Sequence, residues 1–583
     1  MQPALRCGLP LMGLLLALAA ITARAAAPHV TVQTEGVSGA LLKNVLAYLS
    51  INTYRDAPGL NASLVERLNA RAPDEIKKAL EPFGYYRPDI KSDLQSTADG
   101  WLAHYTIVLG KPVQVRNLDV SLAGAGEHDA AFMKYLAVLP LAAGMQLNQP
   151  IYEEVKRRLQ EIAAHRGYIY ARFTDNVLRV DPAQYWADVV LHFDTGPRYY
   201  FGAVSFQQDF MDPQFLAQYL SFKPGDPYDA GKLLALEYAL NDSDYFSSVD
   251  VAVLRDQAGD DRRIPIRITL TPRKRNKYTL GLGYGTDTGP RATLGWENRR
   301  LNGEGHRFSV LGQYSHVLTS TQLNYTVPTP NGPQLVYGLS NTRQVYNGSS
   351  VAYTSILGVN RYTSLDAWSW NQYLQLEHDR SDLPSGNTTS TLVLPGSTFL
   401  RSVSDDPLYP THGYRLSLDL RAANTAWGSS TSFVQAHLFA KLILPLGEQT
   451  RLLLRGELGA TAVKSFAALP LSQRFFTGGD QSVRGFAYDS IGPTDQNGNV
   501  IGGKDVTVGS LEVDHMFGRV FGVAAFMDAG NAANSFTTSL EKGVGLGLRW
   551  RTPVGMVRFD VAHPVKRPDL DRYRIHISIG PDL

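Results

Sequence analysis

Alternation of apolar and polar residues dominates the second half of the chain. The first such run sets large apolar side chains against small ones, namely Tyr278, Leu280, Leu282 and Tyr284 against Thr279, Gly281, Gly283 and Gly285. Successive residues of a strand point to opposite faces, so this run predicts a strand with one apolar face and one nearly bare face. Runs of about ten such residues, separated by turn residues, are typical of a transmembrane barrel. Counting them over 276–583 predicts about 16 antiparallel strands.

The charges on the inner faces separate a membrane barrel from a soluble β-sandwich. A later run alternates Tyr414, Leu416, Leu418 and Leu420 with Arg415, Ser417, Asp419 and Arg421. In a sandwich these charged side chains would lie in a dry core, where unpaired charges are costly. In a barrel they face a wet lumen while the apolar residues face lipid. Beyond the N-terminus no run of about 18 apolar residues occurs, so we expect membrane insertion through strands.

A different pattern covers residues 28–274, where helical and strand periodicities alternate. A unit of about 80 residues occurs three times, over 28–111, 112–197 and 198–274. In each unit a helix ends at a similar motif, which is Gly84-Tyr85, Gly167-Tyr168 or Asp244-Tyr245. The pattern predicts a strand-helix-helix-strand-strand module in each unit, an α+β fold. Three unrelated small α+β domains are the alternative, but they would not repeat these motifs in register.

The N-terminus has the features of a secretory signal peptide. Met1 to Ala26 contains Arg6, an apolar core from Leu9 to Ala20, and Ala23-Arg24-Ala25 as a cleavage site. We therefore expect the mature protein to leave the cytoplasm. Cys7 is the only cysteine and would be removed with this segment, so we expect no disulfide, thiolate metal site or cysteine nucleophile.

Charge and motif spacing argue against nucleic-acid binding and catalysis. The sequence has 56 Lys and Arg residues against 54 Asp and Glu residues, and loss of Arg6 and Arg24 would leave the two classes equal. No G-x-S-x-G nucleophile motif occurs, and the histidines lack the spacing of metal ligands. The glycine run 281–285 is not followed by a predicted helix, which a nucleotide-binding loop needs. We therefore expect no enzymatic activity, no cofactor, no metal and no nucleic-acid partner.

A glycine-rich loop at 464–503 contains Val483-Arg484-Gly485-Phe486. An arginine stays charged, so inside a barrel it needs carboxylate partners. The alternation turns Asp528 inward on one following run and Glu512 inward on another. We predict that the loop folds into the lumen, where Arg484 pairs with Asp528, Glu512 or both. Gly485 would let the backbone approach the wall and Phe486 would wedge against it, so we interpret the motif as a structural clamp.

With these features together, the chain resembles the outer-membrane assembly family, which is built from polypeptide-transport-associated (POTRA) domains and a barrel. Besides the loop motif, the resemblance rests on Phe526 to Gly530 and on Asp405 to Gly413. Within that family the three repeats, the stretch Gly283 to Arg291 and the terminal Gly580-Pro581-Asp582-Leu583 look most like the barrel subunit of the translocation and assembly module. The main barrel assembly protein of the family usually carries five such domains, and two-partner secretion transporters usually carry two.

The resemblance implies a protein that assembles or translocates other proteins at the outer membrane, with its POTRA domains in the periplasm. Its clients would be unfolded outer-membrane proteins of the autotransporter type, and outer-membrane lipid would surround its barrel. A further partner would be an inner-membrane-anchored subunit that spans the periplasm and docks on the first module, Val30 to Leu109. Two other functions stay open: a two-partner pore that exports one dedicated exoprotein, and the main barrel assembly protein. A passive porin would lack the repeats.

The first and last predicted strands would meet at a seam. The residues that we expect to shape it are Gly281, Gly283, Gly285, Ile577 and Gly580. Glycines on one face of the first strand weaken side-chain pairing, and the last glycine precedes a proline, which cannot donate a backbone hydrogen bond. We hypothesise that the seam lacks stable hydrogen bonds, opens toward lipid, and templates client strands or thins the bilayer. The alternative is that the glycines only ease barrel curvature.

Overall fold

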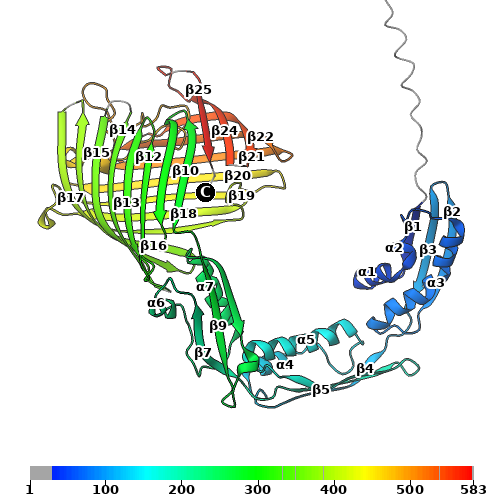
Figure 1. Cartoon of the computed structure of the whole chain (residues 1–583). Helices are drawn as coiled ribbons and strands as arrows, with labels where there is room; N and C mark the ends of the chain where they lie inside the picture. The colour runs from blue at the N-terminus through cyan, green and yellow to red at the C-terminus, as the bar shows by residue number, and fades with distance from the viewer. Residues whose placement is uncertain are drawn as a thin grey trace, which may run out of the picture. The chain divides into compact units, whose positions relative to one another are not determined.

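The structure, a computed structural model, describes residues 29–580 apart from 331, 348–349, 385, 537–538, 554 and 571. The predicted signal peptide with Cys7 and the final residues 581–583 lie outside the described residues. The chain divides into two compact units. The first unit holds two modules and part of a third, and the second unit holds the rest of the third module and the barrel. Figure 1 labels their helices and strands.

Each N-terminal module combines helices with a three-stranded sheet, so the predicted α+β fold is confirmed (Figure 1). The strand orders are β1-β3-β2, β4-β6-β5 and β7-β9-β8. The first module comprises β1 (His29–Glu35), α1 (Gly39–Tyr48), α2 (Ser50–Thr53), α3 (Ala62–Leu80), η1 (Glu81–Phe83), β2 (Asp89–Thr97) and β3 (Gly100–Val108). The second comprises β4 (Gln114–Ala123), α4 (Ala130–Leu136), α5 (Gln149–Arg166), β5 (Arg172–Asp181) and β6 (Trp186–Asp194). The third comprises β7 (Tyr200–Gln207), α6 (Pro213–Ala217), α7 (Ala230–Asp242), β8 (Phe246–Val253), η2 (Arg255–Gln257) and β9 (Arg263–Pro272).

Helical periodicity explains how the long helices cover their sheets. In α3 the buried residues recur at every third or fourth position, as Val65, Leu68, Ala72 and Ile76. These residues share one hydrophobic core with the buried face of β3. Asn61 caps the helix by accepting a hydrogen bond from the Leu64 amide at 3.0 Å, and Asn148 caps α5 through the Ile151 amide. No helix in the described part of the chain is long and apolar enough to cross a bilayer.

In the first two modules, a glycine in the left-handed conformation follows the long helix and contacts the next module. Gly84 (φ +88°) and Gly167 (φ +85°) take this position in the first two modules. The Gly84 carbonyl accepts the Val113 amide of the second module at 2.8 Å, and the Gly167 carbonyl accepts the Tyr199 amide of the third at 2.9 Å. A Cβ at Gly84 or Gly167 would lie 2.8 or 2.9 Å from a backbone oxygen of the next module. The helix-end motif therefore marks the point where one module contacts the next.

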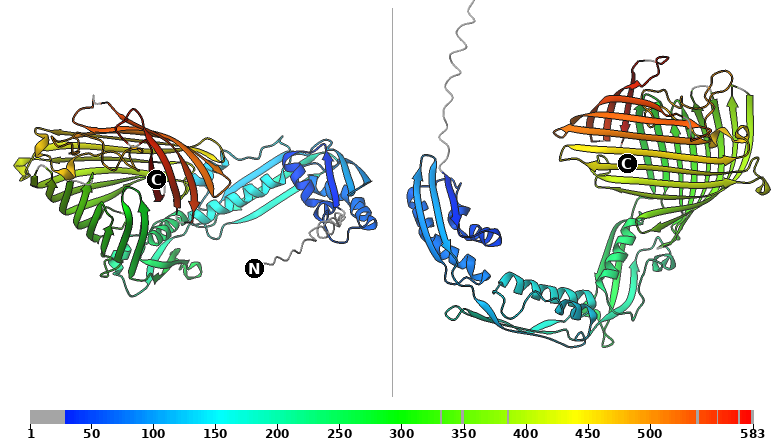
Figure 2. Two further views of the ribbon diagram at one scale, coloured as in Figure 1. Left: turned by 90° about the horizontal axis from the view of Figure 1, so that it is seen from above. Right: turned by 180° about the vertical axis from the view of Figure 1, so that it is seen from behind.

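The remaining chain forms one sheet of sixteen antiparallel strands that curls into a barrel (Figures 1 and 2). This confirms the predicted strand number, and strands that are neighbours in sequence are neighbours in the sheet. Tyr278, Leu280 and Leu282 are between 72% and 81% exposed, as the outer face of a membrane barrel requires. The strands are β10 (Asn276–Gly285), β11 (Gly289–Asn298), β12 (Arg307–Tyr314), β13 (Leu318–Val327), β14 (Gln334–Tyr346), β15 (Ser350–Leu365), β16 (Trp368–Leu383), β17 (Gly386–Ser404), β18 (Gly413–Ala423), β19 (Phe433–Pro445), β20 (Thr450–Val463), β21 (Asp505–Phe517), β22 (Phe521–Ala533), β23 (Glu541–Thr552), β24 (Gly555–Pro564) and β25 (Arg574–Gly580).

The turn between β11 and β12 packs on the third module. The Asp212 amide donates to the Gly303 carbonyl at 2.9 Å, and the Tyr245 hydroxyl donates to the Gly305 carbonyl at 2.5 Å. The Arg307 guanidinium lies 4.5 Å from the centroid of the Tyr245 ring. These contacts fasten the start of the barrel to the module that precedes it.

Candidate functional site in the barrel lumen

The loop between β20 and β21 folds into the barrel and places the tetrapeptide 483–486 against the inner wall. Within Val483-Arg484-Gly485-Phe486, the side chains of Val483, Arg484 and Phe486 are buried. Val483 and Phe486 belong to one hydrophobic cluster with Ile491 of the same loop and with Val506 and Val508 of β21. The two apolar side chains that flank the arginine therefore anchor it on both sides.

Arg484 contacts both of the carboxylates that the strand alternation turns inward. Its Nε and Nη2 donate to the two oxygens of Asp528 at 2.8 and 3.0 Å, and its backbone amide donates to the same carboxylate at 3.1 Å. Its Nη1 donates to Glu512 at 2.6 Å and to Asp560 at 3.0 Å. The guanidinium also stacks on Phe526, 3.4 Å from the ring centroid. Bidentate pairing combined with stacking is specific to arginine, so a lysine could not replace it.

A second buried arginine, Arg549 of β23, extends the pairing into a network. It donates to Glu512 at 2.6 Å, to Asp514 at 3.2 Å and to Asp560 at 2.5 Å. Arg451 of β20 donates to Asp514 at 2.8 Å. The three arginines therefore share their carboxylates, and removal of one group leaves a buried charge without its partner.

Two glycines let the loop backbone lie directly on the barrel wall. A Cβ at Gly543 of β23 would lie 1.8 Å from the Arg484 carbonyl oxygen. Gly485 has φ +97°, and a Cβ there would lie 3.1 Å from the backbone nitrogen of Pro564. The Gly485 amide donates to Nε2 of His576 on β25 at 2.9 Å. The loop is therefore held by its backbone as well as by its charged side chain.

A polar cavity of about 570 Å³ lies beside this clamp. Charged side chains from several strands and from the loop line it, among them Arg415, Lys441, Arg455, Glu457, Asp480 and Arg558. The inner face of the barrel is charged, as expected from the alternation.

The first and last strands lie side by side, yet in the described residues they form no ladder (Figure 1). A backbone hydrogen bond joins the two edges just beyond β10, from the Thr286 amide to the Ile577 carbonyl at 3.2 Å. The Thr286 hydroxyl also accepts the Ile577 amide at 3.1 Å. All other neighbouring strands of the barrel are paired. The seam is therefore the weakest junction of the sheet.

The bare inner face of β10 leaves room for a side chain that bridges the seam. Arg291 of β11 lies over Gly283, with its Nη2 3.4 Å from the position of a Cβ there. The same Nη2 donates to the Ile579 carbonyl of β25 at 3.5 Å, and Arg558 donates to the Gly580 carbonyl at 3.2 Å. The other glycines on this face of β10 are Gly281 and Gly285. The long Arg291 side chain therefore spans a junction that has few backbone bonds, whereas Arg558 lies on β24 and bonds to β25 on the same side of the seam.

Asp287, Asp480 and His576 form the one group of possible metal ligands within the described ranges, with ligand atoms inside 4.8 Å of one another. Because Nε2 of His576 accepts the Gly485 amide, a neutral ring carries its proton on Nδ1, which faces Asp480. In this tautomer both ring nitrogens of His576 are engaged in hydrogen bonds, so neither offers a free lone pair to a metal ion. The three residues therefore form a hydrogen-bonded cluster.

Domain models of known families match three parts of the chain. The Omp85 superfamily domain matches residues 300–582. The first POTRA domain of TamA matches residues 31–109, and a POTRA domain described as a surface antigen variable number repeat matches residues 199–273. Residues 300–582 therefore form an Omp85 superfamily domain, and POTRA domains precede it in this chain.

The relatives of this Omp85 protein include outer membrane protein assembly factors. BamA of Nitratidesulfovibrio vulgaris is 24% identical over 367 residues, which cover 58% of this chain and 45% of that protein. BamA of Neisseria meningitidis serogroup B is 23% identical over 491 residues, which cover 72% of this chain and 61% of that protein. The chain therefore spans only about half of these relatives. A crystal structure of BamA from Haemophilus ducreyi lacking POTRA domains 1–3 shares the fold, with a TM-score of 0.67 at 18% identity over 80% of this chain and 99% of that one.

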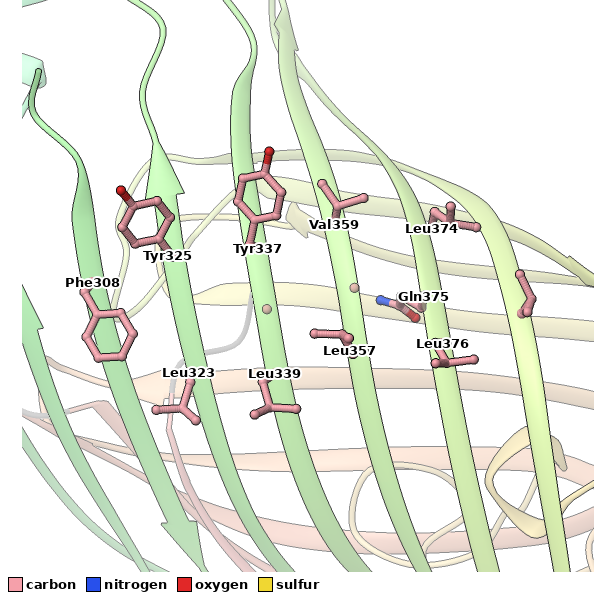
Figure 3. Close-up of a pocket in the computed structure, with 13 residues that line it drawn as sticks. Phe308, Leu323, Tyr325, Tyr337, Leu339, Leu357, Val359, Leu374, Gln375 and Leu376 are labelled. Carbon is pink, nitrogen blue, oxygen red and sulfur yellow. The ribbon is translucent and has the colours of Figure 1, made fainter.

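As an Omp85 protein, the chain has its barrel in the outer membrane and its POTRA domains in the periplasm. The outer face of the barrel suits that location. A hollow of about 690 Å³ lies on this face. Figure 3 shows the mostly apolar side chains of neighbouring strands that line it, among them Phe308, Leu323, Tyr325, Tyr337, Leu339, Leu357, Val359, Leu374 and Leu376. Such a surface is matched by lipid acyl chains rather than by water.

Sequence reasoning brought Arg484, Asp528 and Glu512 together but missed other members of the network. Arg549 and Asp560 were overlooked although the same alternation turns them inward, the first between Leu548 and Trp550 and the second between Phe559 and Val561. Gly543 was missed because its role depends on a close approach by a residue far away in the sequence. No local pattern reports such a contact.

Proposed function

We propose that this Omp85 protein is an outer-membrane protein assembly and translocation factor whose barrel acts on its clients through the seam between β10 and β25. The observation that carries this proposal is the seam itself, where β10 and β25 form no ladder within the described residues, although all other neighbouring strands of the sheet are paired. An exposed strand edge binds an added strand through main-chain hydrogen bonds, which tolerate many side chains. A client β-strand is therefore the ligand that best fits this edge.

Seam opening and client insertion are coupled by the cost of unpaired backbone groups in lipid. Each such group costs several kcal/mol in hydrocarbon, so an open edge without a partner is unfavourable. A client strand satisfies these groups while it enters the membrane. The free energy for insertion then comes from the pairing and burial of the client, and the protein acts without enzymatic chemistry or a cofactor.

The POTRA domains receive clients or a partner in the periplasm. In the first module β1 and β2 are the edge strands of the sheet, which is where an extended chain can add. The match of residues 31–109 to the first POTRA domain of TamA supports the finer proposal. In that proposal the clients are unfolded autotransporter-type proteins, and a TamB-like subunit, anchored in the inner membrane and spanning the periplasm, docks on this module.

A disulfide across the seam tests the proposal. Gly285→Cys and Ser578→Cys place thiols in positions that line one cavity beside the Thr286 to Ile577 hydrogen bond. Cys7 is the only native cysteine, so the engineered pair has no competitor in the barrel. Surface display of an autotransporter client is measured with the pair oxidised and then reduced. We expect oxidation to abolish display and reduction to restore it.

The matched control is a disulfide at a junction that is already paired. Thr293→Cys and Gln313→Cys lie directly opposite each other in the ladder of β11 and β12, so oxidation there should leave display unchanged. Undiminished display with the seam locked would refute the proposal and leave the lumen as the export route, as in a two-partner secretion pore. Assembly of a porin, measured in parallel, shows whether the protein acts on one class of client or on many. Loss of both the porin and the autotransporter when the seam is locked would indicate the main barrel assembly protein.

A further inference from the structure

His576 touches the lumen loop and the last strand of the seam at once. It lies on β25, and its side chain is 2% exposed. Its Nε2 accepts the Gly485 amide at 2.9 Å, and Gly485 directly follows the clamp residue Arg484. Its Nδ1 is hydrogen-bonded to Asp480, a second residue of the loop. Both ring nitrogens of a seam residue are therefore bound by the loop.

Asp480 carries this contact across to the first strand. Its carboxylate oxygens accept the Thr286 hydroxyl at 3.0 and 3.2 Å. Thr286 makes the two hydrogen bonds to Ile577 that cross the seam. The Asp480 amide donates to Asp287, the residue next to Thr286. The residue that closes this end of the seam is therefore itself held by the loop.

The donors and acceptors form one continuous chain. The Gly485 amide donates to His576, whose Nδ1 proton is donated to Asp480. The Thr286 hydroxyl donates to the same carboxylate and accepts the Ile577 amide. Hydrogen bonds in such a chain polarise one another, so loss of one weakens the others.

We propose that His576 and Asp480 are positioning residues that couple the lumen loop to the seam. With Arg484 seated on the wall, the chain holds Thr286 against Ile577 and keeps this end of the seam closed. When the loop leaves, Asp480 leaves with it and the seam loses the residue that closes it. This inference rests on the proposed function, since coupling matters only if the seam opens. It identifies the event that would release the seam, namely unseating of the loop.

Hydrogen–deuterium exchange of the full chain in lipid nanodiscs measures the seam without any client. His576→Phe removes both ring hydrogen bonds. His576→Gln keeps an acceptor for Gly485 and a donor for Asp480, so it should behave as a conservative replacement. The matched control is His437→Phe, which removes another lumen histidine bonded to a carboxylate, Glu457 at 2.8 Å, at the fully paired junction of β19 and β20.

We expect His576→Phe to speed exchange over residues 574–580 at least about tenfold, because closing bonds of this kind set the rate of local opening. His576→Gln should stay close to the parent protein, and His437→Phe should leave these residues unchanged. Unaltered exchange in His576→Phe, or an equal increase in His576→Gln, would overturn the inference. Heat-modifiable mobility of each variant shows that its barrel is folded.

A double-mutant experiment distinguishes coupling between the loop and the seam from simple support of β25 by His576. Arg484→Ala unseats the loop and should speed exchange at 574–580 in the parent protein, but should add nothing in the His576→Phe background. Rate factors that multiply would show that His576 supports only its own strand, which also overturns the inference. Exchange is measured without a client, so the two tests are independent. Undiminished display with the seam locked would refute the proposed function alone, and unaltered exchange in His576→Phe would refute the coupling alone.

Discussion

Arg484 and Asp528 are joined through both the side chain and the backbone of the arginine. Two guanidinium nitrogens donate to the carboxylate at 2.8 and 3.0 Å, and the Arg484 amide donates to it at 3.1 Å. The side-chain bonds depend on the charges of the pair, whereas the third bond depends only on an acceptor at position 528. A charge exchange between the two positions therefore cannot be symmetrical.

The charge exchange gives the first prediction. Arg484→Glu alone and Asp528→Arg alone should each release the loop 464–503, because each leaves like charges facing one another in a buried site. The combined variant should recover only part of the loop's resistance to limited proteolysis, because the new carboxylate at position 484 would face Glu512 and Asp560, and the amide of residue 484 would face a guanidinium. Full recovery would contradict both the backbone bond and the contacts with Glu512 and Asp560.

Gly543→Ala should unseat the loop with no change in charge. The new methyl group would lie 1.8 Å from the Arg484 carbonyl oxygen, so one backbone segment must move. We expect a cost of about 1–3 kcal/mol in the free energy of unfolding and faster proteolysis of the loop. Gly509→Ala on β21 is the matched control, since nothing lies within 4 Å of its Cβ position. Equal behaviour of the two variants would contradict the close contact.

Gly396→Ala should destabilise a different part of the barrel. Gly396 lies opposite Tyr373 in the ladder of β16 and β17, and its Cβ would lie 2.2 Å from the Tyr373 ring. The Tyr373 hydroxyl donates to Asp419 at 3.0 Å, which keeps the ring in place. We expect a loss of about 1–3 kcal/mol, measured as a lower urea midpoint for barrel unfolding in lipid vesicles. Gly456→Ala, with open space at its Cβ, should leave the midpoint unchanged.

His192 makes the stability of the second module depend on pH. Hydrogen bonds to Asp119 at 2.9 Å and to Asp175 at 3.1 Å raise the pKa of His192 above its usual value of about 6.5. The folded state binds this proton more tightly than the unfolded state does. The resulting stabilisation is therefore complete below a pH of about 6.5 and is lost as the pH rises through the raised pKa.

Nuclear magnetic resonance of selectively labelled histidines measures this pKa directly, with His192→Gln to assign the signal. Asp119→Asn combined with Asp175→Asn should return the pKa of His192 toward its usual value. Asp93→Asn, which changes an exposed carboxylate of the first module, should leave it in place. A pKa that is insensitive to both neighbouring carboxylates would refute this explanation.

A period of two was enough to predict the barrel and the inward direction of Asp528. That signal is local, since Asp528 faces the lumen because Met527, its neighbour, is 53% exposed on the outside. The register between strands is not local. Only the pairing of β21 with β22, which sets Asp528 opposite Ser510, brings Glu512 to the same guanidinium as Asp528. The alternation therefore supplied candidates, and the folded sheet selected among them.

The repeat of the helix-end motif shows a similar limit. Its spacing predicted three modules, but not why the third has Asp244 where the others have glycine. Asp244 takes φ +62°, a conformation that aspartate tolerates better than most residues. Its carboxylate also accepts Nε of Arg299 at 2.7 Å, a contact that glycine cannot make. Asp244 therefore links the third module to the residues that follow β11 of the barrel.

The unpaired edges of β10 and β25 have a consequence for how partners are chosen. In water such an edge is a hazard, because any extended chain can add to it and start aggregation. A bilayer removes most of these encounters, since only a segment that already lies in the membrane plane can reach the edge. Under the proposed function, clients would then be selected by where and when they reach the edge, and one barrel could act on clients that share no sequence.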